Sequence, residues 1–132
     1  MAIQNRNDFC YETNFNSTPL FWPQRFKEKG YKLHLIYFCL DSIEEAKRRV
    51  NIRVQNGGHF VPENEITKRY FEGFTNLNAH FHYFDFVDVY DTSTYIGDPK
   101  YLLSIEDGVV VTKGELPQYL IPLIPVIAKM TP

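Results

Sequence analysis

Three arginines in the middle of the chain have the type and spacing needed to bind an anion. Arg49 and Arg53 lie four residues apart in a helical pattern, and Arg69 lies in a second helical pattern beyond the turn Gly57-Gly58-His59. Two helices joined by a glycine turn can bring guanidinium groups together over one ligand. The planar guanidinium pairs with two phosphate oxygens at once. The spacing therefore makes a phosphate site one hypothesis for this stretch.

The same arginines also fit a purely structural role. Glu45 precedes Arg49 by four residues, and Glu65 precedes Arg69 by four. This is the spacing of ordinary ion pairs on the surface of a helix. From the residues alone, both explanations remain open.

Polar side chains also follow two strand-like runs. The aromatic run Phe9–Thr13 ends in Glu12 and Thr13, and the run Phe84–Asp91 ends in Asp91 and continues into Thr92-Ser93. Open α/β sheets place their ligands beyond the carboxyl ends of their strands. We therefore expect these polar residues to lie near a ligand.

Composition limits the classes of function. The chain has 132 residues, 44% of them hydrophobic, and a formal net charge of -2, which predicts one globular domain and argues against a broad nucleic-acid surface. It contains no apolar run long enough to span a membrane and no visible signal peptide.

Cys10 and Cys39 lie in apolar runs and are expected to be reduced core thiols, which favours the cytoplasm. His80 and His82 have no nearby carboxylate or thiolate, so we predict no metal site.

Helices and strands alternate along the chain, which is typical of an α/β fold. Gly30 ends a first helix, and Leu33–Leu40 is apolar on both alternating faces, as a central strand buried under helices requires. Ser42 and Glu45 form a capping-box pattern that opens the next helix. A further helix is predicted from Pro62 to about residue 80, and its expected apolar face consists of Ile66, Tyr70, Phe74, Leu77 and Phe81. The apolar residues expected to face the core from the helix that Ser42 opens are Ile43, Ala46, Val50 and Val54.

The last third of the chain predicts a β-hairpin. Tyr101–Glu106 and Val109–Lys113 flank Asp107-Gly108, a strong two-residue turn signal. Pro117–Lys129 has apolar residues at helical spacing but contains internal prolines, so a short, irregular helix is expected there.

The sequence RVNIRVQNGGHFVPENEITKRY, preceded by GYKLHLIYFCLDS, resembles the zeta-toxin-like group of P-loop kinases. The upstream FCYETNF resembles the segment that follows the third strand of that family, so the resemblance covers about residues 9–93. The specific element is GGHxVPExxIxxRY. The resemblance implies a Rossmann-like parallel sheet, ATP or GTP with Mg²⁺, and phosphoryl transfer to a small-molecule acceptor.

The resemblance also implies roles for individual residues. Arg53, His59 and Arg69 would belong to a mobile lid at about residues 42–80 that closes over the nucleotide phosphates. Arg53 and Arg69 would be the catalytic residues, because they would neutralise the charge that develops during transfer. Glu12 and Thr13 would lie near the acceptor or the metal, and Asp91 would lie near the nucleotide base.

The sequence departs from the family at one decisive place. The phosphate-binding loop G-x-x-x-x-G-K-[ST] is absent, because none of the seven glycines opens that pattern. We therefore expect a single α/β domain with an incomplete P-loop kinase-like parallel sheet, flanking helices and a C-terminal hairpin. Its expected function is that of the lid and substrate half of an ATP- or GTP-dependent small-molecule kinase, inactive alone. The alternative is a truncated, non-catalytic relative that binds a nucleotide or a protein, with an antitoxin or a second copy as possible partners.

One structural prediction follows from the missing segment. In the fold that the chain resembles, the absent first strand lies between Phe9–Thr13 and Leu33–Leu40. Unpaired backbone groups along such a gap are costly when they are buried. We therefore predict that Phe9–Thr13 pairs directly and in parallel with Leu33–Leu40, the alternative being that another chain fills the slot.

Overall fold

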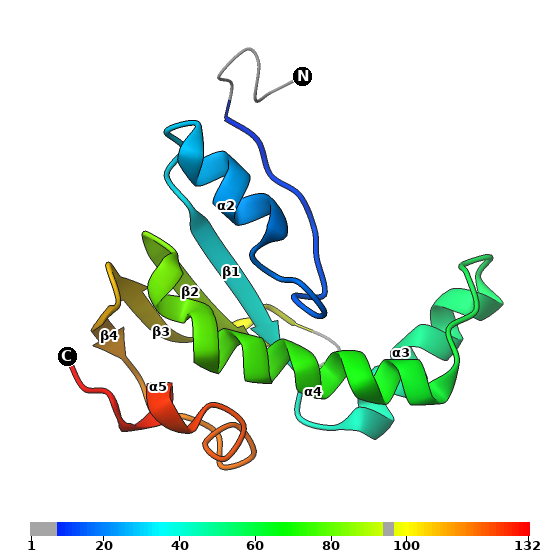
Figure 1. Ribbon diagram of the computed structural model, residues 1–132. Helices are drawn as coiled ribbons and strands as arrows, with labels where there is room; N and C mark the ends of the chain where they lie inside the picture. The colour runs from blue at the N-terminus through cyan, green and yellow to red at the C-terminus, as the bar shows by residue number, and fades with distance from the viewer. Residues whose placement is uncertain (1–7, 94–96) are drawn as a thin grey trace.

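The computed structural model describes residues 8–93 and 97–132, which form a four-stranded mixed sheet with flanking helices (Figure 1). The strands lie in the order β1 (His34–Cys39), β2 (Phe86–Asp91), β3 (Lys100–Glu106) and β4 (Val109–Lys113). β1 and β2 are parallel, whereas β3 and β4 are antiparallel to their neighbours. The helices are α2 (Phe21–Glu28), α3 (Ile43–Gln55), α4 (Glu63–His80), the 3-10 helix η1 (Phe81–Tyr83) and α5 (Pro125–Lys129). The predicted α/β class is confirmed.

The predicted hairpin is confirmed, and it extends the same sheet. Asp107 and Gly108 have φ values of 50° and 80°, the pair of positive angles that a tight two-residue hairpin turn requires. β3 then pairs with β2, so the hairpin adds two antiparallel strands to the parallel pair. The sheet is therefore mixed.

The core lies between one face of the sheet and the helices α2, α4 and α5. Val87 and Leu103 are fully buried on this face of the sheet, and they meet Leu77 from α4 and Ile127 from α5. Figure 1 shows these three helices on the same side of the sheet. Along β1 and β2, more buried residues alternate with more exposed ones, as expected for a sheet with a single covered face.

The prediction that Leu33–Leu40 is covered on both faces is wrong. Leu35 and Cys39 are buried, but Ile36 and Phe38 on the opposite face are 50% and 56% exposed. β1 is also an edge strand, because β2 is its one partner among the described residues. Apolar residues on both faces of β1 therefore did not mean that the strand lies in the centre of the sheet.

The prediction of a strand at Phe9–Thr13 is also wrong. No residue of this segment has strand structure, and it does not pair with β1. Instead, the ring of Phe9 packs edge-on against Phe26 of α2 with centroids 4.8 Å apart, and the ring of Tyr11 does so at 5.8 Å. The aromatic side chains thus hold the segment on α2 rather than beside the strand. Cys10 is exposed as a result, which corrects its predicted place in the core, while Cys39 is buried as predicted.

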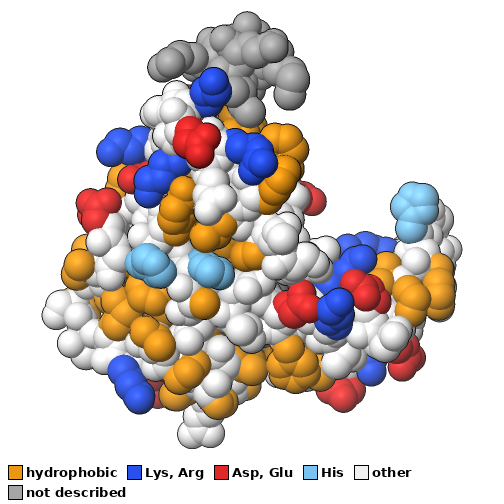
Figure 2. Space-filling model, in the orientation of Figure 1, with side chains coloured by type: hydrophobic (Ala, Val, Ile, Leu, Met, Phe, Trp, Pro, Cys, Tyr) orange, Lys and Arg blue, Asp and Glu red, His pale blue; other side chains and the backbone are white. Residues whose placement is uncertain are grey.

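α3 and the first half of α4 form an arm that projects beyond the sheet (Figures 1 and 2). We use "arm" for α3, the connecting residues 56–62 and α4 as far as Tyr70. The Ser42 hydroxyl caps α3 by accepting a hydrogen bond from the Glu45 amide at 3.1 Å, as the capping pattern predicted. No residue of α3 is buried, so the expectation that its apolar residues face the core is wrong. Those residues are half-buried, and α3 packs against α4 instead.

No helix in the described part of the chain has the length and apolar character needed to cross a bilayer.

Candidate anion-binding site

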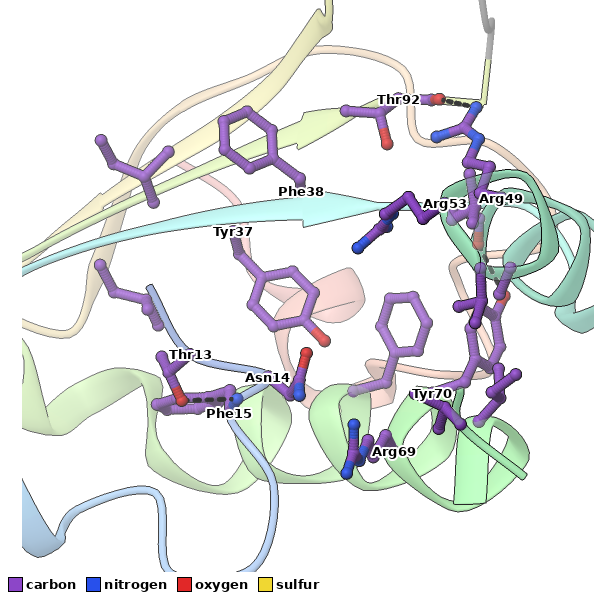
Figure 3. Close-up of a pocket in the computed structure, with 18 residues that line it drawn as sticks. Thr13, Asn14, Phe15, Tyr37, Phe38, Arg49, Arg53, Arg69, Tyr70 and Thr92 are labelled. Carbon is purple, nitrogen blue, oxygen red and sulfur yellow. Dashed lines mark hydrogen bonds between the residues drawn. The ribbon is translucent and has the colours of Figure 1, made fainter. Parts of the chain in front are cut away.

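A cavity of about 390 Å³ lies where the arm meets the sheet (Figure 3). Its walls come from residues 13–15, the edge strand β1, both helices of the arm, and Thr92 after β2. The residues from β1 include the consecutive run Leu35–Phe38. Because consecutive strand residues point to opposite faces, the cavity follows the free edge of β1 rather than one face of the sheet. The slot that we expected Phe9–Thr13 to close is therefore open.

Arg53 enters the cavity from α3, and its guanidinium has no hydrogen-bond or ion-pair partner among the described residues. The residue is exposed. Its backbone is fixed by the end of the helix, since the Arg53 carbonyl accepts a hydrogen bond from the Gly58 amide at 2.7 Å. A Cβ at Gly58 would lie 2.8 Å from the same carbonyl oxygen, so only glycine fits there without a shift. Gly57 has a φ of 94° and provides the left-handed residue that ends α3.

The other two arginines of the cavity are engaged with protein groups. Arg69 donates to Glu65 at 3.1 Å, and Arg49 donates to Glu45 at 3.0 Å, so both predicted helix ion pairs are present. Arg49 also donates to the carbonyl of Thr92 at 2.7 Å, which ties α3 to the end of β2. Both side chains nevertheless line the cavity. Figure 3 shows Arg53 and Arg69 approaching the space from the two helices of the arm.

The carboxylate of Glu45 balances positive charge on α3, where it pairs with two arginines. It accepts hydrogen bonds from Arg48 at 2.8 and 2.5 Å in addition to the bond from Arg49. The hydrogen bonds from Arg48, and then those from Arg49, lower the pKa of Glu45 to about 2. Glu45 is therefore ionised at neutral pH and remains committed to these two arginines.

Aromatic residues form the opposite wall. The Tyr70 hydroxyl donates to the carbonyl of Leu40 at 2.6 Å, and burial raises the pKa of Tyr70 to about 12. Burial raises the pKa of Tyr37 further, so both phenols stay protonated. The Tyr37 hydroxyl lies over Gly73 of α4, where a Cβ would collide with it. This wall is thus fixed by contacts that leave no space for a larger residue at Gly73.

The remaining residues predicted for the site are placed differently. Thr13 lines the cavity, and its hydroxyl accepts a hydrogen bond from the Phe15 amide at 3.0 Å. Glu12 and His59 are exposed, and neither is among the residues that line the cavity. Asp91 is also outside the lining and belongs to a local network.

That network occupies the Asp91 carboxylate. It accepts hydrogen bonds from the Ser93 amide at 3.0 Å, from the Ser93 hydroxyl and from the Tyr119 hydroxyl at 2.9 Å. Burial raises the pKa of Tyr119, so its phenol stays protonated as a donor. In this structure Asp91 therefore joins the end of β2 to the C-terminal segment.

Several lining residues were not singled out as site residues from the sequence. Tyr37 and Phe38 were assigned to a buried strand, and Tyr70 and Phe74 to the core face of a helix. An aromatic core pattern and an aromatic cavity wall look the same in a sequence. Among the described residues, no group of three or more His, Cys, Asp or Glu side chains is arranged to hold a metal ion.

Comparisons with known proteins give one relative and no function. No family model matches the chain, and no solved structure matches it. A curated protein from Haemophilus influenzae (strain ATCC 51907 / DSM 11121 / KW20 / Rd), named "Uncharacterized protein", is 39% identical to this chain over 70 residues. The match covers 52% of this chain, which thereby spans about half (50%) of the length of that relative. Any function must therefore be argued from the site.

Proposed function

We propose that the cavity binds the phosphate groups of a nucleotide such as ATP or GTP, and that the chain is the lid and acceptor-binding half of a zeta-toxin-like small-molecule kinase. The observation that carries this proposal is the Arg53 guanidinium, which lines the cavity and has no partner among the described residues. Arg49 and Arg69 line the same cavity. Three guanidinium groups around one space favour an anionic ligand.

Charge and shape divide the cavity into two parts that suit a nucleotide. Glu45 and Glu65 already balance Arg49 and Arg69, so Arg53 is the arginine whose charge is left for a ligand. A phosphate oxygen can accept bonds from it and from the outward N–H groups of Arg69. The aromatic side chains that line the apolar wall are Phe15, Tyr37, Phe38, Tyr70 and Phe74. Such a wall can take the flat face of a base.

In phosphoryl transfer, the protein mainly positions the acceptor and neutralises developing charge. Arg53 and Arg69 have the chemistry for neutralisation, and Thr13 lies on the cavity wall where an acceptor hydroxyl could be held. Among the described residues that line the cavity, there is no carboxylate and no histidine that could remove the acceptor proton. We therefore expect the chain to bind without turnover when it is alone.

Magnesium does not fit the described residues that line this cavity. Mg²⁺ prefers oxygen ligands and is usually held by one or two carboxylates together with substrate phosphates. The described residues of the lining include three arginines and no Asp or Glu. Any Mg²⁺ would have to be held by the nucleotide itself or by another chain.

A second candidate function is a binding module for a nucleotide or a protein with no part in catalysis. The absence from the sequence of a G-x-x-x-x-G-K-[ST] loop favours it, as does the lack of a general base among the described residues of the lining. Nucleotide binding is common to both candidates. A phosphorylated product that appears only when a second, loop-bearing protein is added would favour the kinase half.

Titration calorimetry with ATP and with GTP, each with and without Mg²⁺, tests the proposal. We expect binding by the wild-type chain that is weakened about 5- to 150-fold in Arg53→Ala, the equivalent of roughly 1–3 kcal/mol for a charge-assisted hydrogen bond. Arg48→Ala is the matched control, since Arg48 lies on the same helix but outside the cavity lining. Absence of binding, or equal losses in Arg48→Ala and Arg53→Ala, would contradict the proposal.

A further inference from the structure

One hydroxyl in the wall of the cavity has no protein partner. Tyr37 lines the cavity from β1, and its hydroxyl makes no hydrogen bond to any described residue. By contrast, Tyr70 in the same wall donates to the Leu40 carbonyl, and Tyr119 donates to Asp91. A phenol that is mostly removed from water normally has such a partner. The Tyr37 hydroxyl is therefore a donor that a ligand can use.

The position of this hydroxyl is fixed by its neighbours. The Tyr37 ring packs against Phe15 and Phe74, with ring centroids 6.4 and 5.7 Å apart. Its hydroxyl end rests over Gly73, where a Cβ would collide with it. The same Cβ would lie 3.2 Å from the backbone carbonyl oxygen of Asn14, so the hydroxyl and the turn at Asn14 are neighbours. Figure 3 shows Tyr37 and Asn14 facing the same part of the cavity.

Asn14 is held by a turn with unusual backbone angles. Phe15 and Ser17 have φ values of 54° and 55°, in the left-handed region that a residue as bulky as phenylalanine rarely adopts. Helix α4 fixes both residues, because the Asn76 side chain donates to the Phe15 carbonyl at 2.9 Å and the Ser17 amide donates to Glu72 at 3.0 Å. Such strain persists only where the surrounding contacts determine it, and it is common at ligand sites. The turn therefore keeps Asn14 at one place on the cavity wall.

The cavity thus has two parts of different chemistry. The Asn14 side chain lines it and, like the Tyr37 hydroxyl, has no hydrogen-bond partner among the described residues. Both groups are neutral, whereas Arg53 and Arg69 are cations. Gly73, beneath the Tyr37 hydroxyl, follows Arg69 by four residues and lies one helical turn, about 5.4 Å, further along the same face of α4. A ligand whose anionic group reaches Arg69 therefore has its next polar group close to Tyr37 and Asn14.

We propose that Tyr37 and Asn14 form a subsite for the sugar hydroxyls of a phosphate ester whose phosphate binds the arginines. This inference rests on the proposed anion site and adds the neutral part of the ligand to it. The Tyr37 hydroxyl donates to a sugar oxygen, and the Asn14 amide both donates and accepts, so the pair matches hydroxyl groups. The ribose of a nucleotide and the sugar of a sugar phosphate share this chemistry. Tyr37 and Asn14 determine specificity and have no part in bond breaking.

Titration calorimetry with ATP, 2′,3′-dideoxy-ATP and inorganic triphosphate tests the subsite. We expect the wild-type chain to bind ATP about 3- to 10-fold more tightly than the dideoxy compound, the effect of a neutral hydrogen bond. Tyr37→Phe and Asn14→Ala should each lose this preference and bind triphosphate as the wild type does. Tyr90→Phe is the matched control, since Tyr90 lies on the neighbouring strand β2 and outside the cavity lining. It should keep the preference.

Thermal unfolding separates this role from a merely structural one. Because the Tyr37 hydroxyl has no protein partner, its removal in Tyr37→Phe should leave the melting temperature unchanged or raise it. A lowered melting temperature with an equal loss of affinity for all three compounds would mean that Tyr37 only supports the wall, and would overturn the proposal. If Tyr37→Phe does not fold, Asn14→Ala decides, since the Asn14 side chain is exposed.

Ribose 5-phosphate distinguishes the two sources of the sugar. If the wild-type chain binds ATP and dideoxy-ATP equally, binding of ribose 5-phosphate that is weakened in Tyr37→Phe supports the subsite with a sugar phosphate as its ligand. Equal binding of the nucleotides together with no effect of Tyr37→Phe on ribose 5-phosphate overturns the subsite and leaves the anion site standing, provided that triphosphate binding still depends on Arg53. Absence of triphosphate binding rejects the anion site, and the subsite with it.

Discussion

The sheet and the arm are packed in very different ways. Val87, Val89 and Leu103 are fully buried between the sheet and its helices, whereas α3 contributes no buried residue. The arm is fastened to the sheet by polar contacts such as those from Arg49 to the Thr92 carbonyl and from Tyr70 to the Leu40 carbonyl. Arg49 and Arg53 lie on α3, which has no buried residue, whereas Tyr37 and Phe74 of the aromatic wall pack into or against the core. The comparison indicates that part of the aromatic wall is anchored in the core, and that two of the cations facing it lie on a loosely packed helix.

Stability should therefore be unequal between the two regions. We expect Leu103→Ala to lower the free energy of unfolding by about 2–5 kcal/mol, because it leaves a cavity in a closed core. Val54→Ala on α3 should cost less than about 1 kcal/mol, since its side chain is half-buried and the site can relax. Urea denaturation measures both values. Equal losses would contradict the division into a packed sheet and a loosely packed arm.

The junction between the two regions can be tested at Gly73. Replacing glycine by alanine within a helix ordinarily stabilises it by about 1 kcal/mol. At Gly73 the added methyl would collide with the Tyr37 hydroxyl and lie 3.2 Å from the Asn14 carbonyl oxygen, so we expect a net loss of roughly 1–3 kcal/mol.

Denaturant unfolding of Gly73→Ala gives this sign directly. Thr75→Ala, at an exposed position of the same helix, is the control and should be nearly neutral. A stabilised Gly73→Ala variant would mean that Tyr37 moves freely and that the cavity wall is not fixed.

The smallest expected effect lies on the arm itself. The pKa of Glu45 falls from 4.5 to about 2 in the folded chain, mainly because of the hydrogen bonds from Arg48 and then those from Arg49. A lowered pKa in the folded state means that the ionised carboxylate stabilises the fold above its unfolded pKa, and that this contribution is lost as the pH falls from 4.5 towards 2.

Melting temperatures of the wild-type chain and of Glu45→Gln, measured from pH 6 to pH 3, test this statement. The difference between the two proteins should be largest at pH 6 and should shrink as the pH falls. A constant difference would show that Glu45 does not carry the shifted titration.

Local sequence signals predicted the elements that depend on neighbouring residues. Asp107-Gly108 predicted the hairpin, Ser42 the start of α3, and the spacing of Ile66, Phe74 and Leu77 the buried side of α4. Each of these features is determined within a few residues along the chain. The sequence could therefore specify them without knowledge of the rest of the fold.

Predictions that depended on distant partners were the ones that failed. The alternation in Leu33–Leu40 shows that both faces are apolar, but whether a helix covers a face depends on segments far away in the chain. The aromatic run Phe9–Thr13 satisfies strand propensity equally well when its rings pack on α2. For the same reason, Arg53 was predicted as a candidate from its spacing, whereas the aromatic wall formed by Tyr37 and Phe74 could not be told from core packing.

Hydrogen–deuterium exchange with and without ATP tests the central claim, that the arm and the sheet together form an anion site. We expect saturating ATP to slow amide exchange in α3 and in the first turns of α4, to leave the amides of β2 and β3 unchanged, and to have no such effect on Arg53→Ala. Exchange in α3 that is unaffected by ATP, or that is slowed equally in Arg53→Ala, would contradict the account.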